Sequence, residues 1–291
     1  MKHSFFKFLI LGLVVSLTGF WSCSGDVDPD GRNGEIDCED LDYGDTLVFI
    51  RPGQNFSIAP LNSATGKYSS TPDGLALNTD TGVIDVNASE TGLKYKISFT
   101  PTGSTQVCET FLTIGGVNYL DGVFIINQNQ LFVSPVYNGN PDLLLPCPDD
   151  DGTGSGSGDD NSCDFDAENP TGELLEDLGF EIDSKGVIDL EETIDNGTFG
   201  TIPVNGTILD VEMYYKINDE SALALNKIPL RFFYYAKLSD VPKEVLDDIE
   251  EKRNLINEST NDKNSNFRIS NTVRPPRKPR PPYIVIVASL Q

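Results

Sequence analysis

Residues 74–100 read GLALNTDTGVIDVNASETGLKYKISFT, and this stretch decides the fold class. Its first half has alternating leucines, a turn-forming NTDTG segment and a VIDV run that returns, which together predict a β-hairpin. Its second half contains KYKISF at residues 94–99, where polar and apolar side chains alternate strictly. We therefore expect a third strand with one apolar face, formed by Tyr95, Ile97 and Phe99.

The hairpin pattern occurs a second time, in the C-terminal half of the chain. Residues 179–190 read GFEIDSKGVIDL and repeat the spacing of GLAL and GVIDV in residues 74–86, with a turn that is one residue shorter. Self-similarity of this kind indicates a recurring structural unit. The sequence thus predicts two copies of one β module.

The region around the first hairpin has the pattern of a β-sandwich, because residues 38–146 hold roughly eight short strand candidates and no convincing helix. Residues 46–50 and 107–114 are two of these candidates. Residues 123–126 and 131–133 flank a polar NQNQ segment and predict a further hairpin.

Three segments of this region carry a family resemblance. GKYSSTPDGLAL at residues 66–77, TGVI at 81–84 and TGLKYKISF at 91–99 resemble the bacterial Ig-like and cadherin-like repeats of surface proteins. Cys108 falls where several such repeats carry a late cysteine. The resemblance implies an Ig-like fold and an extracellular setting, and it implies no chemistry. The sequence lacks the calcium-ligand motifs of true cadherins, so calcium-dependent adhesion is not implied.

The C-terminal region continues with strands and then departs from the first module. Residues 208–217 alternate with one apolar face, and residues 228–235 form an aromatic strand whose Pro229 suggests a strand edge or start. Residues 239–254 predict a helix with proline near its first turn. Residues 283–288 predict a strong terminal strand that pairs in the sheet.

The predicted fold class is therefore all-β, with two Ig-like β-sandwich domains in tandem. The second domain is expected to carry a helical and Pro-rich insertion before its last strand. The predicted segments are a lipoprotein signal peptide at 1–22, an acidic tether at 23–37, an Ig-like β-sandwich at 38–148, a Gly/Ser/Asp linker at 149–162 and a second Ig-like β domain at 163–291 with its insertion at 240–282.

The N-terminus has the features of a secretory signal. Two lysines accompany an apolar run, residues 8–17, that is too short for a good membrane span. The following Phe20-Trp-Ser-Cys23 resembles the lipobox of bacterial lipoproteins, in which the cysteine becomes acylated, although Phe20 and Trp21 replace the usual leucine and small residue. We expect lipid attachment at Cys23. The alternative is an ordinary secretory signal that is cleaved nearby.

The residues after Cys23 are acidic, and this run resembles the export signal of lipoproteins displayed on the outside of Gram-negative cells. The expected location is the outer membrane, with a lipid anchor and exposure at the cell surface. The whole chain has 45 acidic and 21 basic residues, for a formal net charge of −24. That charge argues against nucleic acid as a partner, because phosphate binding needs a basic surface.

The acidic segment also contains a spacing that suits calcium. Asp26, Asp28 and Asp30 precede a glycine, and Asp37 stands at the twelfth place, which resembles calcium loops of the dockerin and EF-hand type. Asn33 stands where an apolar anchor is usual, and no amphipathic helix flanks the run. The alternative is a solvated acidic tether without a metal. Apart from calcium, no cofactor is expected.

Four cysteines remain besides Cys23, and an oxidising compartment favours disulfide bonds between them. Four cysteines allow three connectivities. We favour Cys38–Cys108, which ties the entry of the first module to one of its late strands, and Cys147–Cys163, which closes a loop across the linker.

Two further features carry a functional and a structural interpretation each. The basic RPPRKPRPP run at residues 274–282 is either a docking segment for an acidic partner or glycan, or a stiff loop. A group of aromatic residues near the C-terminal strands either stacks on sugars or divides between core and surface. The group consists of Tyr214, Phe232, Phe233, Tyr234 and Tyr235.

Catalytic chemistry is largely excluded by composition. The only histidine is His3, inside the predicted signal, which excludes Ser-His-Asp and Cys-His nucleophile pairs and histidine metal sites from the mature chain. A carboxylate pair for glycoside hydrolysis has no local spacing rule, so a hydrolase is the third hypothesis, but no sequence feature indicates such a pair and we expect no enzyme. The predicted function is a lipid-anchored cell-surface protein that acts as a structural, adhesive or binding module for an unknown protein or glycan. The alternative is a carbohydrate-binding accessory lipoprotein of a polysaccharide uptake system.

Overall fold

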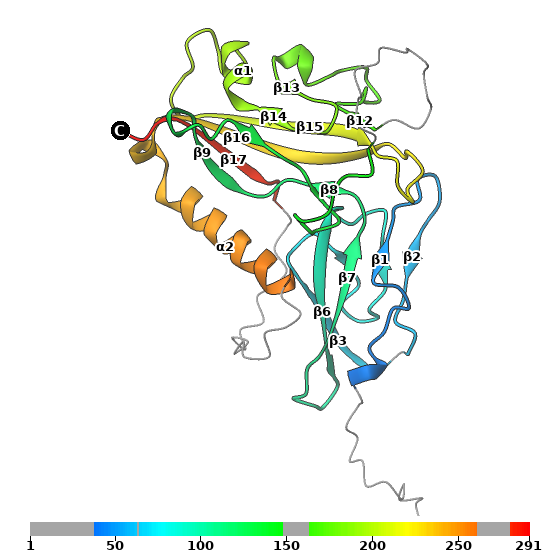
Figure 1. Cartoon of the computed structure of the whole chain (residues 1–291). Coiled ribbons are helices and arrows are strands. Elements are labelled where there is room, and N and C mark those ends of the chain that lie inside the picture. Colours follow the sequence, from blue (N-terminus) through cyan, green and yellow to red (C-terminus); the bar gives the residue numbers. More distant parts are fainter. Residues whose placement is uncertain (1–37, 63, 148–162, 261–279) are drawn as a thin grey trace, which may run out of the picture. The chain divides into compact units, whose positions relative to one another are not determined.

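The computed structural model describes residues 38–62, 64–147, 163–260 and 280–291 (Figure 1). Within these ranges the regular secondary structure is mostly β-strand, with two α-helices, α1 (Leu190–Asp195) and α2 (Lys243–Thr260). Four short 3-10 helices lie between the other elements: η1 (Cys38–Asp40), η2 (Ile126–Gln128), η3 (Glu176–Leu178) and η4 (Leu238–Asp240). The all-β prediction is confirmed.

The first lobe, residues 38–116, contains seven strands in two sheets. One sheet has the order β1-β7-β6-β3 and the other has the order β2-β5-β4. The strands are β1 (Leu47–Val48), β2 (Ser57–Ile58), β3 (Gly66–Thr71), β4 (Ala76–Leu77), β5 (Ile84–Asp85), β6 (Leu93–Pro101) and β7 (Cys108–Ile114).

The order of these strands is that of an Ig-like sandwich. Lettered A to G along the chain, they divide into an A-G-F-C sheet and a B-E-D sheet, and the first strand runs parallel to the last. Immunoglobulin-type sandwiches separate C, F and G from B, E and D in the same way. Side chains of both sheets share one core, which includes Tyr95, Ile97 and Ile84. The Ig-like expectation is confirmed for this lobe.

Residues 74–100 form the predicted hairpin and strand. β4 and β5 pair antiparallel, and the turn between them is closed by the Gly82 N–H, which donates to the Asn78 carbonyl at 2.8 Å. Gly82 has a φ of +71°, and a Cβ there would lie 2.7 Å from the ring of Tyr68, so this position requires glycine. β6 alternates as expected, and its core-facing side chains are buried.

The second lobe, residues 117–291, is built on a five-stranded sheet with the order β12-β15-β16-β17-β9. The β16–β17 and β17–β9 pairs are parallel, and the other two pairs are antiparallel. The strands are β12 (Asp164–Phe165), β15 (Thr207–Lys216), β16 (Asn226–Lys237), β17 (Tyr283–Ser289) and β9 (Gly122–Ile125).

Smaller sheets complete this lobe. The second copy of the hairpin, β13 (Glu181–Ile182) and β14 (Ile188–Asp189), pairs with β10 (Phe132–Val133) in a three-stranded sheet. β8 (Val117–Asn118) and β11 (Val136–Tyr137) form a two-stranded sheet that follows directly on the first lobe. The predicted repeat of the hairpin is thus present, in a different setting.

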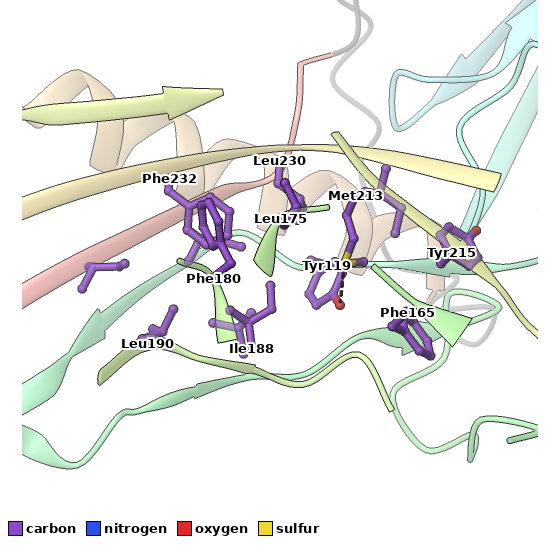
Figure 2. Packing of buried hydrophobic residues seen from close by; sticks show 14 of the residues in the cluster. Tyr119, Phe165, Leu175, Phe180, Ile188, Leu190, Met213, Tyr215, Leu230 and Phe232 are labelled. Atoms are coloured by element: carbon purple, nitrogen blue, oxygen red, sulfur yellow. Dashed lines mark hydrogen bonds between the residues drawn. The ribbon is translucent and has the colours of Figure 1, made fainter. Parts of the chain in front are cut away.

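The five-stranded sheet is covered on both faces (Figure 1). One face packs against β13, β14 and neighbouring segments, and Figure 2 shows this core, in which the rings of Phe180 and Phe232 lie 4.8 Å apart. The other face packs against α2, through Val245 and Ile249 of the helix. Because both faces are buried, the inner strand β17 reads as the continuous apolar run YIVIV.

The second lobe differs from the expected second sandwich. In the sequence, α2 connects β16 to β17, which are parallel neighbouring strands of the sheet. Parallel neighbouring strands need a crossover connection of this kind. The helix therefore belongs to the connectivity of the sheet, where the sequence suggested an insertion. Pro229 lies two residues before Arg231, the first residue of β16 that pairs with β17, so one side of the strand is open where the proline occurs.

The hairpin predicted from residues 123–126 and 131–133 is wrong. β9 pairs with β17 and β10 pairs with β14, in two different sheets. Strands from both sides of the predicted linker at 149–162 consequently belong to one sheet, and the tandem arrangement of two separate sandwiches is not confirmed. The physical reason is that the hydrophobic pattern of a strand buried on both faces does not indicate which other strand it pairs with.

Candidate functional site

The most distinctive polar site of the structure lies where α2 and β8 meet the first lobe. Glu90 comes from the loop before β6, Asn118 from β8 and Lys252 from α2. We call these three residues the junction cluster. Asn118 is 1% exposed and Lys252 is 9% exposed, so two strongly polar side chains are withdrawn from water. Buried polar groups of this kind need partners, because an unpaired one costs on the order of 1–3 kcal/mol.

The partners are supplied within the cluster. The Asn118 Nδ2 donates to Glu90 Oε1 at 2.9 Å and to the Thr91 carbonyl at 2.8 Å. The Lys252 Nζ lies 3.8 Å from the same Oε1 of Glu90. The Asn118 Oδ1 accepts from the backbone N–H of Tyr119 at 2.8 Å. One carboxylate oxygen therefore faces both an amine and a carboxamide nitrogen.

The backbone holds the carboxylate and the carboxamide close together. The Glu90 carbonyl accepts from the Tyr95 hydroxyl at 2.8 Å, and the Gly92 N–H donates to the Ile114 carbonyl at 2.8 Å. Gly92 has a φ of +70°, and a Cβ there would lie 2.3 Å from the carbonyl carbon of Val117. The loop and β8 can approach this closely only because residue 92 is glycine.

The helix places Lys252 on the side that faces the protein. Val245 and Ile249 pack against the five-stranded sheet, and Ile256 packs against the core of the first lobe. Lys252 falls between them at helical spacing, on the same stripe of the helix. Packing of the apolar residues on either side of the lysine thus positions it at the junction.

Burial changes the acid–base behaviour of the cluster. Loss of solvation raises the pKa of Glu90 above its ordinary value, while Lys252 and the hydrogen bond from Asn118 act in the opposite direction. The carboxyl group can therefore hold a proton more readily than a surface glutamate.

A second network joins the lobes next to the cluster. The hydroxyls of Thr91 and Tyr215 lie 2.9 Å apart, and the Tyr215 hydroxyl also accepts from Asn226 Nδ2 at 2.8 Å and from the Val117 N–H at 3.3 Å. Burial raises the pKa of Tyr215, so the phenol stays neutral. The network supplies partners from both lobes to one fully buried hydroxyl.

A third contact involves the basic proline run. Arg280 forms an ion pair with the buried carboxylate of Asp121, donates to the Asp248 carbonyl at 2.8 Å and lies 3.8 Å from the ring centroid of Tyr283. Asp121 also accepts from the Tyr283 N–H at 3.1 Å. Residues 274–279 of the run lie outside the described residues. Arg280 itself therefore takes part in contacts within the protein.

The predicted lipid and calcium residues cannot be placed. Cys23, Asp26, Asp28, Asp30 and Asp37 all lie outside the described residues, so acylation and calcium binding stay predictions. In the part of the chain that the structure describes, no group of three or more histidine, cysteine, aspartate or glutamate residues could hold a metal ion.

The predicted disulfide pairing is confirmed. Cys38 and Cys108 are bonded with their Cα atoms 4.9 Å apart, and Cys147 and Cys163 are bonded with their Cα atoms 5.4 Å apart. Both distances lie in the usual range for disulfides. The first bond fastens η1 to β7, and the second joins the two ends of the predicted linker.

The aromatic run does not form a sugar-stacking surface. Phe232, Phe233, Tyr234 and Tyr235 are all buried, because they alternate between the two covered faces of the sheet. Tyr214 is half-buried, and its hydroxyl donates to Glu212 Oε2 at 3.2 Å. The structural interpretation of this run, as core residues, is therefore the correct one for four of its five members.

Sequence reasoning missed the junction cluster. Lys252 left one usable signal, because a lysine on the apolar stripe of a helix, between Ile249 and Ile256, has to be buried or to reach outward. Glu90 and Asn118 left none, since each is a single polar residue in a loop or a short strand. Only the packing of α2 against the first lobe brings the three together.

Comparisons with known proteins give little further guidance. No family model matches the chain, and no curated protein matches it. Two crystal structures of the EC1-2 segment of human protocadherin-24 are similar at 13% and 10% identity, covering 65% and 64% of this chain and 92% and 89% of theirs. The TM-score is 0.20 for each, which is too low to equate the folds.

None of the described helices is long and apolar enough to cross a membrane.

Proposed function

We propose that this chain is a non-enzymatic, lipid-anchored protein of the outer membrane, exposed at the cell surface, where it acts as a structural or binding module. The observation that carries the proposal is the pairing of Cys38 with Cys108 and of Cys147 with Cys163. Disulfides persist in the oxidising compartments outside the cytoplasm, where the segment that ends at Cys23 would deliver the protein.

A structural role is supported by the way the two lobes are fastened. The junction cluster, the Tyr215 network and the Arg280–Asp121 pair each connect segments that are far apart in the sequence. Several independent contacts of this kind resist relative motion of the two lobes, because all of them would have to break together. We infer that the described body acts as one stiff unit.

A non-enzymatic role is supported by the chemistry of the chain. The only histidine is His3, in the predicted signal peptide. The strongest cluster of reactive side chains, the junction cluster, is buried and its members contact one another, so it is not offered to a soluble substrate.

The alternative function as a carbohydrate-binding accessory protein loses its main support with the burial of residues 232–235. It stays a prediction that a glycan array tests. Binding to sugars that Tyr214→Ala abolishes would favour it, and an array without binding would remove it.

The proposed location is tested by treating intact cells with protease and by mass spectrometry of the N-terminal peptide. We expect an acylated Cys23 and digestion of the body from outside the cell, and we expect Cys23→Ser to release the protein from the membrane fraction. An unmodified N-terminus, or a body that protease reaches only after lysis, would contradict the proposal and favour a periplasmic role.

A further inference from the structure

The junction cluster contains the three groups that are needed to form an amide between side chains. Lys252 brings a primary amine, Asn118 brings a carboxamide and Glu90 brings a carboxyl group that contacts both nitrogen atoms through one oxygen. The cluster is withdrawn from water, which prevents solvent from competing for the reacting atoms. The fold holds the amine and the carboxamide against the same carboxylate oxygen, which supplies the proximity that a bimolecular reaction would lack.

We propose that Lys252 and Asn118 become joined by an intramolecular isopeptide bond, and that Glu90 carries the protons for its formation. The reaction expels one molecule of ammonia and needs no oxidant, reductant or added cofactor. It is independent of where the protein is located, so it stands or falls separately from the proposed function.

The reaction begins with a proton transfer from the Lys252 ammonium group to the Glu90 carboxylate. The neutral Nζ then attacks Cγ of Asn118, and a new C–N bond forms. Glu90 gives its proton to Nδ2 and takes one from the former lysine nitrogen. The bond between Cγ and Nδ2 breaks, ammonia leaves and the carbonyl of the new amide is restored.

Two features of the geometry suit this sequence. The Nδ2 that must leave already donates to Glu90 Oε1 at 2.9 Å, so the acid is beside the leaving group. The Oδ1 that gains negative charge in the tetrahedral intermediate accepts from the backbone N–H of Tyr119 at 2.8 Å, which acts as an oxyanion donor. The raised pKa of Glu90 helps the carboxyl group to hold the transferred proton between the two steps.

The bond would fasten α2 to β8, which lie on opposite sides of the segment 148–162 in the sequence. A cross-link between distant positions restricts the unfolded chain in the way that a disulfide does. It would also survive reduction, unlike the two disulfides of this protein. The junction between the lobes would then hold in reducing and oxidising conditions alike.

The first test uses the full chain with a protease site engineered into residues 152–158. The protein is cleaved there, reduced and run on a denaturing gel. We expect one band that contains both halves, because the Lys252–Asn118 bond spans the cut. Lys252→Ala and Asn118→Ala should each give two bands. Lys243→Ala is the matched control on the same helix, and should give one band, because Lys243 is exposed and pairs with Asp247.

The second test is the mass of the uncleaved wild-type protein after reduction and alkylation. We expect a mass lower than that of the sequence by one ammonia, and a branched peptide that joins Asn118 to Lys252 after digestion. Glu90→Gln keeps the size of the side chain and should restore the full mass. Two bands from the wild-type protein, with linear peptides that carry unmodified Asn118 and Lys252, would overturn the proposal even if every variant failed to fold. Loss of water, with an amide between Lys252 and Glu90, would overturn it too.

Discussion

The two lobes reach a buried β core by different routes. In the first lobe, strand pairs such as β4–β5 and β6–β7 are antiparallel and adjacent in the chain. In the second lobe, β17 is the partner of β16 across a helix and of β9 across more than half the chain, and both pairs are parallel. The first lobe is thus specified by local sequence pattern. The second lobe depends on pairing between segments that are far apart in the sequence.

The largest expected effect comes from separating the chain at the predicted domain boundary. A fragment of residues 163–291 lacks β9, β10 and β8, so we expect it to be unfolded, whereas a fragment of residues 38–116 keeps all seven strands of the first lobe and should fold. Amide dispersion in two-dimensional NMR spectra measures this. Adding residues 117–147 to the C-terminal fragment as a separate peptide should restore its dispersion. A well-dispersed spectrum of 163–291 alone would contradict the comparison.

The next effect concerns the core that both halves of the chain build. Phe232 is fully buried and packs on Phe180, so Phe232→Ala should lower the free energy of unfolding by about 3–5 kcal/mol. Chemical denaturation measures the change. The matched control is Phe132→Ala, because Phe132 is 57% exposed and its loss should cost no more than about 0.5 kcal/mol. Equal losses for the two variants would show that the core is placed wrongly.

The two hairpins permit a smaller comparison at equivalent positions. Asp189 caps α1, and its Oδ1 accepts from the N–H groups of Glu191 and Glu192 at 3.0 Å, whereas Asp85 accepts one N–H, from Ala88, at 3.1 Å. Asp189→Ala should cost about 1 kcal/mol of unfolding free energy, as loss of a helix cap does. We expect Asp85→Ala to cost less in the same denaturation measurement. The reverse order would mean that the helix cap is not the stronger of the two.

The smallest expected effect is at the surface of the second lobe. Arg231 forms a two-point ion pair with Asp210 and lowers the pKa of that carboxyl group. Because the pKa is lowered in the folded state, the stabilisation is fully present above the ordinary aspartate pKa and is lost as the pH falls from there through the lowered pKa of the folded state. Asp210 is more than half exposed, so Asp210→Asn should cost at most about 1 kcal/mol at pH 7. Thermal melts at neutral and acidic pH measure this, and a cost that grows in acid would contradict it.

Much of the first lobe was predictable from the sequence, because alternation and turn residues act locally. The NTDTG turn, the β6 face of Tyr95, Ile97 and Phe99, and the pairing of Cys38 with Cys108 all follow from neighbours in the chain or from one favoured connectivity.

The arrangement of the second lobe was less predictable. The three long strands β15, β16 and β17 were identified at nearly their observed places, and the helix predicted at 239–254 overlaps α2. The strands β8, β11 and β12 and the helix α1 were not identified, and neither was the partner of β9, since an apolar run fits beside any buried strand. The junction cluster depends in turn on that arrangement. Glu90, Asn118 and Lys252 meet only after α2 has crossed over the sheet, and no spacing in the sequence encodes their contact.

The central claim is that strands from both sides of the segment 148–162 build one body. It is tested most directly by cleaving an engineered protease site in that segment, reducing Cys147–Cys163 and passing the product through a sizing column under native conditions. The Lys252→Ala variant is used, so that only non-covalent contacts can hold the halves together. We predict that the two halves elute together at the position of the uncleaved protein. Separate elution of two folded halves would contradict the claim and restore two independent domains.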